Sequence, residues 1–566
     1  MANKVFLLGL DGATWDMLGP LLRDGHLPNL ARLKEKGASG TLNSVFPPLS
    51  PVAWTSIMTG KNSGKHGIFE FVEHGHDPLK GRVNSSRAIQ SNLIWEIAGQ
   101  HGKKTVMGAI PMSYPPRPKA NFPGFFLGDF LSPANAADFS TDPTLFAELE
   151  AHLGKPYRAW ATKIHDGGNE SAVLDDLDDF LEQNLKAIEF LMDRCEWDLF
   201  LFDLMAIDRS QHELWHIWDA AHPEAKGREK EVAALRQRYI EFWKTLDRGM
   251  GRILAKIPDD ATVLVMSDHG FGPITHYVNF NVWLLEQGFI ALQDSFYVKQ
   301  KHWFYRRGLT PEWVYNLMQR LGMADHRVSR FRGKQDSFLD RLGESTFLSR
   351  RHIDWSRTRA YAQGNFGQIF LNLKGRQPQG AVEPEDARVL IDALKEALFK
   401  IPHPETGEPL VERIYESSEL YEGPHSHLAP DLTVVLKDWA YRTIGLHDFT
   451  TNRLVSPAFG PTGDHRLEGI LIASGPSIQP GSIPPDANLL DIAPTVLQLL
   501  GIPVPGDMDG RVLDAMLESS ARSDASQSPW AATSETPAEV LNGYGSGYSE
   551  EEDAAIQQRL EDLGYL

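Results

Sequence analysis

The sequence predicts an α/β fold in which helices cover both faces of a mostly parallel sheet. The first observation is a set of short apolar runs with the composition of buried strands, at residues 5–10, 199–204, 263–266 and 469–474. The second is the helical spacing of apolar residues between these runs, over 174–192 and 232–253. Strands buried on both faces are continuously apolar, and their alternation with helices is typical of a parallel sheet.

Polar side chains with metal-binding chemistry lie next to these apolar runs. Asp11 follows the first run, Asp208 comes soon after the second, and Asp268 with His269 follows the third. His465 precedes the fourth run. In open α/β sheets, ligands bind beyond the carboxyl ends of the strands. These residues are therefore candidates for one site.

Composition and charge exclude several kinds of partner. The chain has 566 residues, a formal net charge of -19 and a single cysteine, Cys195, so no intrachain disulfide can form. The negative charge argues against binding to nucleic acid or to anionic membranes. The apolar run at 5–10 is too short for a signal segment, and no window approaches the roughly 20 apolar residues of a membrane span. We expect a cytoplasmic protein; its oligomeric state is left open.

The pattern along the chain predicts a discontinuous core and an insertion. We assign residues 1–278 and 351–518 to the core, and residues 279–350, which are rich in Trp, Tyr, Phe and Arg, to a mostly helical insertion or lid. Ser, Ala, Pro, Gly and Glu dominate 519–549, which predicts a disordered linker. Residues 550–566 are expected to form a C-terminal helix.

The pair Asp268-His269 is the first candidate for metal binding. Adjacent residues of an extended strand face opposite sides, but Gly270 and Gly272 allow a sharp turn that directs both side chains to one place. A carboxylate oxygen and an imidazole nitrogen suit a divalent cation. A turn in which the aspartate caps the next helix is the competing interpretation.

Ser50 is the candidate nucleophile. The order Ser50-Pro51, with Gly60 at the end of the segment, is typical of a helix whose N-cap is the serine, and capping alone would explain it. The same position also places a hydroxyl in the positive field of a helix N-terminus, which favours an alkoxide and a phosphate oxygen. A serine hydroxyl is a weak nucleophile without a base or a metal. No Gly-x-Ser-x-Gly elbow is present at this serine, so metal activation is the better option.

Asp208 and His212 are the third candidate group. Residues four apart lie on one face of a helical turn and can bind one ion, although an exposed helix start with a capping aspartate fits the same pattern. Asp203 and His216 are nearby alternatives, which we expect to be structural or to support the ligands. His465 lies in a glycine-containing loop, where a histidine is often simply exposed.

Taken together and in this order, the motifs resemble the type I phosphodiesterase/nucleotide pyrophosphatase family of the alkaline phosphatase superfamily. Leu-Asp-Gly at Asp11, Ser-Pro-Val-Ala-Trp-Thr-Ser-Ile-Met-Thr-Gly at Ser50, Asp208 with His212, Asp268-His269-Gly270 and the late His465 carry the likeness, over about residues 4–515. The local phrases at 64–68, 429–432 and 508–511 add to it. The resemblance implies an alkaline-phosphatase-like fold for the predicted core.

The resemblance also implies a two-metal site and a reaction. One ion would be held by Asp208, His212 and His465. The other would be held by Asp11, Asp268, His269 and the Ser50 oxygen. Both ions are expected to be Zn²⁺, with Mn²⁺ as the alternative. Ser50 would attack phosphorus in a small-molecule phosphodiester or pyrophosphate, and a covalent phospho-enzyme would then be hydrolysed.

Two departures from the family leave the substrate open. Better-known members have threonine in place of Ser50, and an asparagine that helps to hold a phosphoryl oxygen where this chain has Ala53. Lys61, Asn62 or Lys65 could supply the missing donor, or they could form a solvated loop.

Three other functions share some of these sequence features. A sulfatase would need an arginine where Trp54 stands. A metal-dependent phosphomutase or phosphomonoesterase of the same superfamily is the closer rival. A non-catalytic metal- or phosphate-binding protein is the alternative of another class, and the presence of every predicted ligand argues against it.

Overall fold

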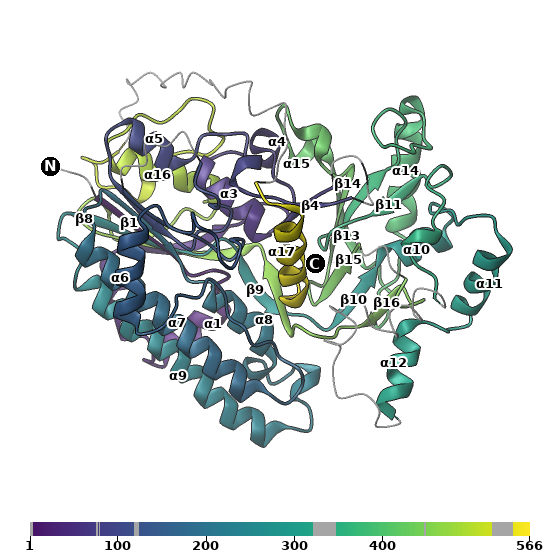
Figure 1. Cartoon of the computed structure of the whole chain (residues 1–566), viewed down its shortest axis with the longest axis horizontal. Helices are drawn as coiled ribbons and strands as arrows, with labels where there is room; N and C mark the ends of the chain where they lie inside the picture. Colours follow the sequence, from purple (N-terminus) through teal and green to yellow (C-terminus); the bar gives the residue numbers. More distant parts are fainter. Residues whose placement is uncertain are drawn as a thin grey trace.

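The computed structural model describes residues 4–74, 77, 80–117, 124–320, 347–445, 449–522 and 547–565. Its largest sheet, at the left of Figure 1, has the strand order β19-β2-β18-β8-β1-β7-β5-β6. Its strands are β1 (Lys4–Gly9), β2 (Ala38–Asn43), β5 (Thr105–Gly108), β6 (Gly124–Leu127), β7 (Leu199–Asp203), β8 (Ala261–Met266), β18 (Glu468–Ser474) and β19 (Gly481–Ser482). The predicted fold class is confirmed, and the apolar runs form β1, β7, β8 and β18.

Strand direction brings the polar segments to one edge of the sheet. β1 pairs in parallel with β7 and with β8, and its last residue, Gly9, lies opposite Asp203 and Met266. The carboxyl ends of these three strands therefore coincide. β18 runs antiparallel to β8, so the start of β18, which follows His465, lies at the same edge.

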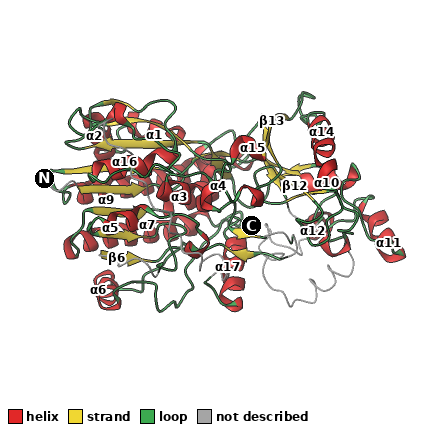
Figure 2. Ribbon diagram, turned by 90° about the horizontal axis from the view of Figure 1, so that it is seen from above, coloured by secondary structure: helices red, strands yellow, loops and turns green. Residues whose placement is uncertain are grey.

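Helices cover both faces of this sheet, as Figures 1 and 2 show. One layer contains α3 (Ser50–Thr59), α5 (Ile94–Gln100) and α16 (Ile492–Leu499), which contact one another. The other contains α1 (Trp15–Arg23), α2 (Pro28–Lys36), α6 (Pro143–Leu153), α7 (Glu170–Arg194), α8 (Ala206–Trp218) and α9 (Glu229–Leu254). The two helical periods predicted from the sequence are α7 and α9, whose buried residues recur at three-to-four spacing.

Short elements extend the sheet edge that carries the polar segments. β9 (Gly270–Pro273) and β17 (Gly463–Arg466) form an antiparallel ribbon in which His465 lies opposite Phe271. The remaining short elements are α4 (Ser63–His66), β3 (Val72–Glu73) and β4 (Arg82–Val83). The ribbon holds His465 beside the turn that follows β8.

A smaller unit with its own apolar core lies at the right of Figure 1. It contains the sheets β15-β10-β16 and β11-β12-β14-β13. Its elements are β10 (His276–Asn279), α10 (Phe280–Glu286), α11 (Phe296–Tyr305), α12 (Pro311–Arg320), β11 (Ala360–Ala362), β12 (Gln368–Leu371), α14 (Ala387–Leu398), β13 (Val411–Glu416), α15 (Ser417–Leu420), β14 (Leu432–Leu436), β15 (Tyr441–Ile444) and β16 (Val455–Pro457). This core runs from Val278 to Val455 and so joins the start of the expected insertion to residues beyond it. Residues 321–346 of that insertion lie outside the described residues, and its function as a lid stays a prediction.

Helix α17 (Glu550–Asp562), yellow in Figure 1, lies between the two units. Residues 523–546, most of the expected linker, lie outside the described residues. Among the helices that the structure describes, none is both long and apolar enough to cross a membrane. The cytoplasmic location stays a prediction.

Candidate metal centre

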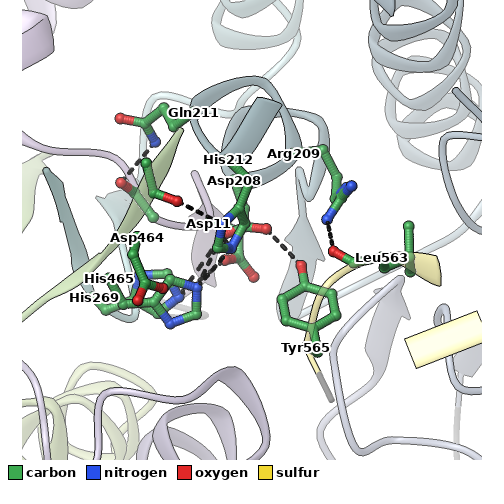
Figure 3. A network of polar contacts seen from close by, with 12 residues as sticks. Asp11, Asp208, Arg209, Gln211, His212, His269, Asp464, His465, Leu563 and Tyr565 are labelled. Atoms are coloured by element: carbon green, nitrogen blue, oxygen red, sulfur yellow. Dashed lines mark hydrogen bonds and ion pairs between the residues drawn. The ribbon is translucent and has the colours of Figure 1, made fainter. Parts of the chain in front are cut away.

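The structure brings six of the seven predicted site residues into one buried cluster. Asp11, Asp268 and His269 lie in the loops after β1 and β8, Asp208 and His212 on the first turns of α8, and His465 on β17. Each of these side chains is at most 2% exposed. Figure 3 shows the side chains of Asp11, Asp208, His212, His269 and His465 gathered in one place.

The three histidines share one orientation. The Nδ1 atom of His212 lies 3.0 Å from the Gly463 carbonyl, and that of His269 lies 3.0 Å from the Gly270 carbonyl. His465 Nδ1 lies 2.7 Å from the Pro48 carbonyl. A carbonyl only accepts, so each Nδ1 carries the proton and donates it. Each Nε2 lone pair then faces the cluster, which is the arrangement of metal-binding histidines.

Asp208 and the histidines define the first predicted metal site. Asp208 Oδ1 lies 3.4 Å from His212 Nε2 and 3.4 Å from His465 Nε2. The two Nε2 atoms are only 2.9 Å apart. Two lone pairs at this distance repel each other unless a proton or a cation lies between them. This donor set fits a Zn²⁺ ion.

The second predicted set meets at His269. Its Nε2 lies 3.5 Å from Asp11 Oδ1 and 3.4 Å from Asp268 Oδ2. The same nitrogen is 4.0 Å from Asp208 Oδ1, and the rings of His269 and His465 stack at 3.6 Å. The two sets are therefore contiguous, as a two-metal site requires.

Several polar atoms of this cluster have no hydrogen-bond partner among the described residues. They are Asp11 Oδ1, Ser50 Oγ, Asp208 Oδ1, Asp268 Oδ2 and His269 Nε2. Leaving a buried acceptor unsatisfied costs about 1–3 kcal/mol, and more for a charged group. Divalent cations would satisfy these acceptors together, so the residues present fit the ions that the sequence predicts.

The pKa values of the cluster also indicate that its residues fit divalent cations. Burial, followed by the charge of Asp268, raises the pKa of Asp11 and of Asp203 well above the ordinary range. Burial raises the pKa of Asp268 to about 7 and lowers the pKa values of His212 and His269 to about 3. These carboxylates tend to keep protons, which a bound cation would displace.

Asp208 differs from the other carboxylates of the cluster. Burial opposes its ionisation, but the charges of His212 and His465 hold its pKa below the ordinary range. The charge of Asp208 in turn raises the pKa of His465, against the effect of burial. Asp208 therefore carries a charge in a place where its neighbours tend to be neutral.

Ser50 does not cap α3, which corrects one interpretation of the sequence. The N-cap is Leu49, Ser50 is the first helical residue, and the Ser50 hydroxyl makes no hydrogen bond to the described residues. The helix is tied to the cluster on both sides of Ser50. His465 binds the Pro48 carbonyl, and Trp54 Nε1 donates to Asp11 Oδ2 at 3.2 Å. The hydroxyl is therefore buried and uncommitted, on a segment that two predicted metal ligands contact.

A glycine at the end of β1 makes this packing possible. A Cβ on Gly9 would lie 2.4 Å from Asp203 Oδ1 and 2.6 Å from the Trp54 ring. Asp203 is itself fully buried behind the cluster, and neither of its carboxylate oxygens has a hydrogen-bond partner among the described residues. Its supporting role stays a prediction.

His216 points away from the metal centre into a second polar cluster. Its Nε2 lies 3.4 Å from Glu170 Oε1, and its ring stacks on that of His165 at 4.8 Å. Arg228 donates to the same Glu170 oxygen at 2.8 Å. A guanidinium already neutralises this carboxylate, so we assign the cluster a structural role although its side chains are of metal-binding types.

Two contacts of the metal centre escaped prediction from sequence. Asp464 lies beside His465 and pairs with the buried Arg442, whose Nε is 3.1 Å from Asp464 Oδ2. Tyr565 donates from its hydroxyl to Asp208 Oδ2 at 2.5 Å. Adjacency to His465 was a usable signal for Asp464; no spacing or motif pointed to Tyr565.

A pocket opens beside His465 between the two units. Its wall includes the aromatic groups of Phe46, Phe366 and Trp439 and the guanidinium groups of Arg442 and Arg466. The polar side chains of the loop after α3 bind aspartates near the end of the main unit rather than this pocket. Lys61 Nζ lies 2.5 Å from Asp507 Oδ2, Lys65 pairs with Asp509, and Asn62 donates to Asp509 at 2.8 Å.

One family model covers most of the chain. Residues 5–447 match the model described as type I phosphodiesterase / nucleotide pyrophosphatase. Among curated proteins, none matches the chain.

Similar solved structures have low sequence identity. Phosphonoacetate hydrolase from Sinorhizobium meliloti 1021, in complex with phosphonoacetate, is 13% identical, with coverage of 88% of this chain and 96% of that chain and a TM-score of 0.51. An inactive variant of murine ectonucleotide pyrophosphatase/phosphodiesterase 5, in complex with AMP, is 13% identical, with coverage of 91% and 100% and a TM-score of 0.47. The likeness to the first structure shows a shared fold.

Proposed function

The chain belongs to the type I phosphodiesterase/nucleotide pyrophosphatase family of hydrolases, and on this basis we propose that it is a two-metal hydrolase of phosphodiester or pyrophosphate bonds with Ser50 as nucleophile. One observation carries the proposal. Ser50 Oγ and ligand atoms of both predicted metal sites are buried without a hydrogen-bond partner among the described residues. A hydroxyl kept free at this cost is available for attack.

The residues of this chain suggest the following reaction. Ser50 Oγ forms a bond to phosphorus while the bond from phosphorus to the leaving oxygen breaks, and the serine proton ends on the leaving group. Water then attacks phosphorus of the phosphoserine, and the bond from phosphorus to Ser50 Oγ breaks. The water oxygen stays with the phosphate, and one water proton restores the serine hydroxyl. When bound, two divalent cations would lower the pKa of the attacking oxygen and offset charge on the phosphoryl group. The N-terminus of α3 adds a favourable field at Ser50.

Ligand chemistry distinguishes the two predicted metal sites. Asp208, His212 and His465 provide two imidazoles and a carboxylate, the donor set that Zn²⁺ favours in catalytic sites. Asp11, Asp268, His269 and Ser50 provide mostly oxygen, which also suits Mn²⁺. We propose zinc at the first site, and zinc or manganese at the second.

The pocket beside His465 is the proposed place for the rest of the substrate. Phe46, Phe366 and Trp439 offer apolar faces, and the guanidinium of Arg442 adds a positive charge next to the metal centre. The pocket suits a small-molecule phosphate ester that has an apolar or aromatic leaving group. Arg442 is paired with Asp464 but lines this pocket together with His465, whereas Lys61 and Lys65 are paired with aspartates and do not line it. Arg442 is therefore the better candidate for the donor that Ala53 does not supply.

The test is a comparison of three chromogenic esters. The metal-free protein is loaded with Zn²⁺ or Mn²⁺ and offered bis-p-nitrophenyl phosphate, p-nitrophenyl phosphate and p-nitrophenyl sulfate. We expect hydrolysis of the diester to be the fastest. Faster release from the monoester would favour a phosphomonoesterase or phosphomutase, and no release from any ester despite bound metal would favour a binding protein.

A further inference from the structure

We propose that the segment after α17 completes the metal centre, with Tyr565 as the positioning residue that fixes the carboxylate of Asp208. The inference rests on the proposed function, because it concerns a ligand of the first predicted metal site. It assigns a role to the C-terminal segment, which the sequence predicts only as a helix.

The segment is anchored to the main unit before it reaches the site. Ile556, Leu560 and Leu563 are buried in the main core. Asp553 Oδ1 accepts from the Val83 amide at 2.8 Å, and Arg559 Nη1 donates to the Ser132 carbonyl at 2.8 Å. Contacts of this number and kind hold the helix in one place over the junction between the units (Figure 1).

A buried arginine next to Asp208 holds the chain as it enters the site. Arg209 is 1% exposed, and its Nη1 donates to the Leu563 carbonyl at 2.6 Å. Its other terminal nitrogen binds Glu213. Glu213 thus neutralises the cation, and Figure 3 shows its remaining donor on the Leu563 carbonyl. Burying an arginine is costly unless it is paired, which indicates that this contact is specific.

Beyond Leu563, the tyrosine ring enters an aromatic recess. Tyr565 is 2% exposed, its ring centroid lies 5.1 Å from that of Phe71, and it meets the His212 ring edge-on at 5.6 Å. Asn365, from the smaller unit, donates to the Tyr565 carbonyl at 3.1 Å. Both units therefore fix the position of the phenol.

The Tyr565 hydroxyl gives the two carboxylate oxygens of Asp208 different roles. The Tyr565 hydroxyl donates to Oδ2, whereas Oδ1 lies 3.4 Å from the Nε2 atoms of both His212 and His465 and has no hydrogen-bond partner among the described residues. One oxygen is thereby left for a cation, and rotation of the carboxylate is restrained. Removing a hydrogen bond of this kind to a metal ligand typically lowers metal affinity or activity by about 10- to 100-fold.

The experiment compares zinc binding by the full chain, by Tyr565→Phe and by a matched control, Tyr305→Phe. Tyr305 is also buried, and its hydroxyl donates to the Thr451 carbonyl at 2.9 Å in the smaller unit. Each substitution deletes one buried phenol hydroxyl. Metal-free proteins are titrated with Zn²⁺ by calorimetry, and their thermal unfolding is measured separately before zinc is added.

We expect Tyr565→Phe to weaken one of two Zn²⁺ binding steps by about 10- to 100-fold and to leave the other step unchanged. Tyr305→Phe should leave both steps unchanged, although the metal-free forms of both variants lose similar stability. Diesterase activity of Tyr565→Phe should recover at saturating Zn²⁺.

Two results would overturn the inference while the proposed function stands. One is normal zinc affinity at both steps in Tyr565→Phe. The other is tighter Zn²⁺ binding and higher activity in that variant, which would mean that Tyr565 blocks the site. If the unsubstituted chain binds no divalent cation, the proposed function fails together with this inference.

Discussion

Helix α8 contributes to two histidine–carboxylate clusters that differ in how the negative charge of their buried carboxylates is balanced. His212 belongs to the metal centre and His216 to the cluster with Glu170. On a regular helix, residues four apart lie on one face. At Leu214, however, φ is -128° and ψ is 16°, which interrupts the helix between the two histidines. The interruption lets His212 and His216 join separate clusters.

The two clusters differ in the source of their positive charge. In the His216 cluster, Arg228 binds Glu170, and despite burial, the hydrogen bonds of His216 and Arg228 hold the pKa of Glu170 below its ordinary range. In the metal centre, burial raises the pKa values of Asp11, Asp203 and Asp268. The first cluster has its own cation in Arg228. The other has more negative groups than its protein neighbours neutralise, and this is the electrostatic signature of a cation site.

The largest expected effect comes from the uncommitted hydroxyl of the metal centre. Ser50→Ala should lower turnover of the diester by about a thousandfold or more, since the variant loses the attacking atom. Zinc stoichiometry should be unchanged, because Asp11, Asp268 and His269 remain. Rapid-quench kinetics and elemental analysis measure the two quantities, and turnover close to that of the unsubstituted chain would reject Ser50 as nucleophile.

The next effect tests whether the metal centre depends on an external cation. His465→Ala should lose one equivalent of zinc, because it removes an imidazole from a set of three ligands. The matched change in the other cluster, His216→Ala, should keep both equivalents. Elemental analysis after dialysis against dilute zinc distinguishes the variants. Equal metal content in both variants would contradict the proposal that only the cluster of His465 binds a metal ion.

The smallest effect tests whether the Glu170 cluster is structural. Glu170→Gln should cost about 1–3 kcal/mol of unfolding free energy at pH 7, because the charged hydrogen bonds from Arg228 and His216 are weakened. The folded-state pKa of Glu170 lies below its ordinary value of 4.5, so its charge stabilises the fold above pH 4.5. This contribution is lost as the pH falls through the folded-state value. Denaturant titrations from pH 7 to pH 3 should show the two proteins converging. A difference that stays constant over this range would contradict the assignment.

Much of the fold and part of the site follow from local sequence. Continuous apolar runs predict β1, β7 and β8, and the residues that follow these strands are the acids of the metal centre. Their convergence needs only parallel pairing, which the lengths of the intervening helices already imply. His465 was harder, because its loop resembles many exposed loops. The order of motifs, rather than its own spacing, singled it out.

Other features depend on contacts that local sequence does not encode. Ser50-Pro51 is compatible both with a capping serine and with a free hydroxyl, and only the fold shows that Leu49 is the cap. Arg442 reaches Asp464 from the smaller unit, across a segment with a separate apolar core. Tyr565 meets Asp208 across 357 residues, and no periodicity extends over such a distance.

The shared edge of β1, β7 and β8 has a geometric consequence. Neighbouring strands lie about 4.8 Å apart, a separation set by main-chain hydrogen bonding. Paired catalytic ions are typically about 3.5–4 Å apart. Asp11 and Asp268 each lie two residues beyond the paired ends of β1 and β8, so the backbone itself spaces these two acids on the scale of one phosphoryl group. The loops around this edge can diverge to suit different leaving groups while the distance between the charges stays fixed.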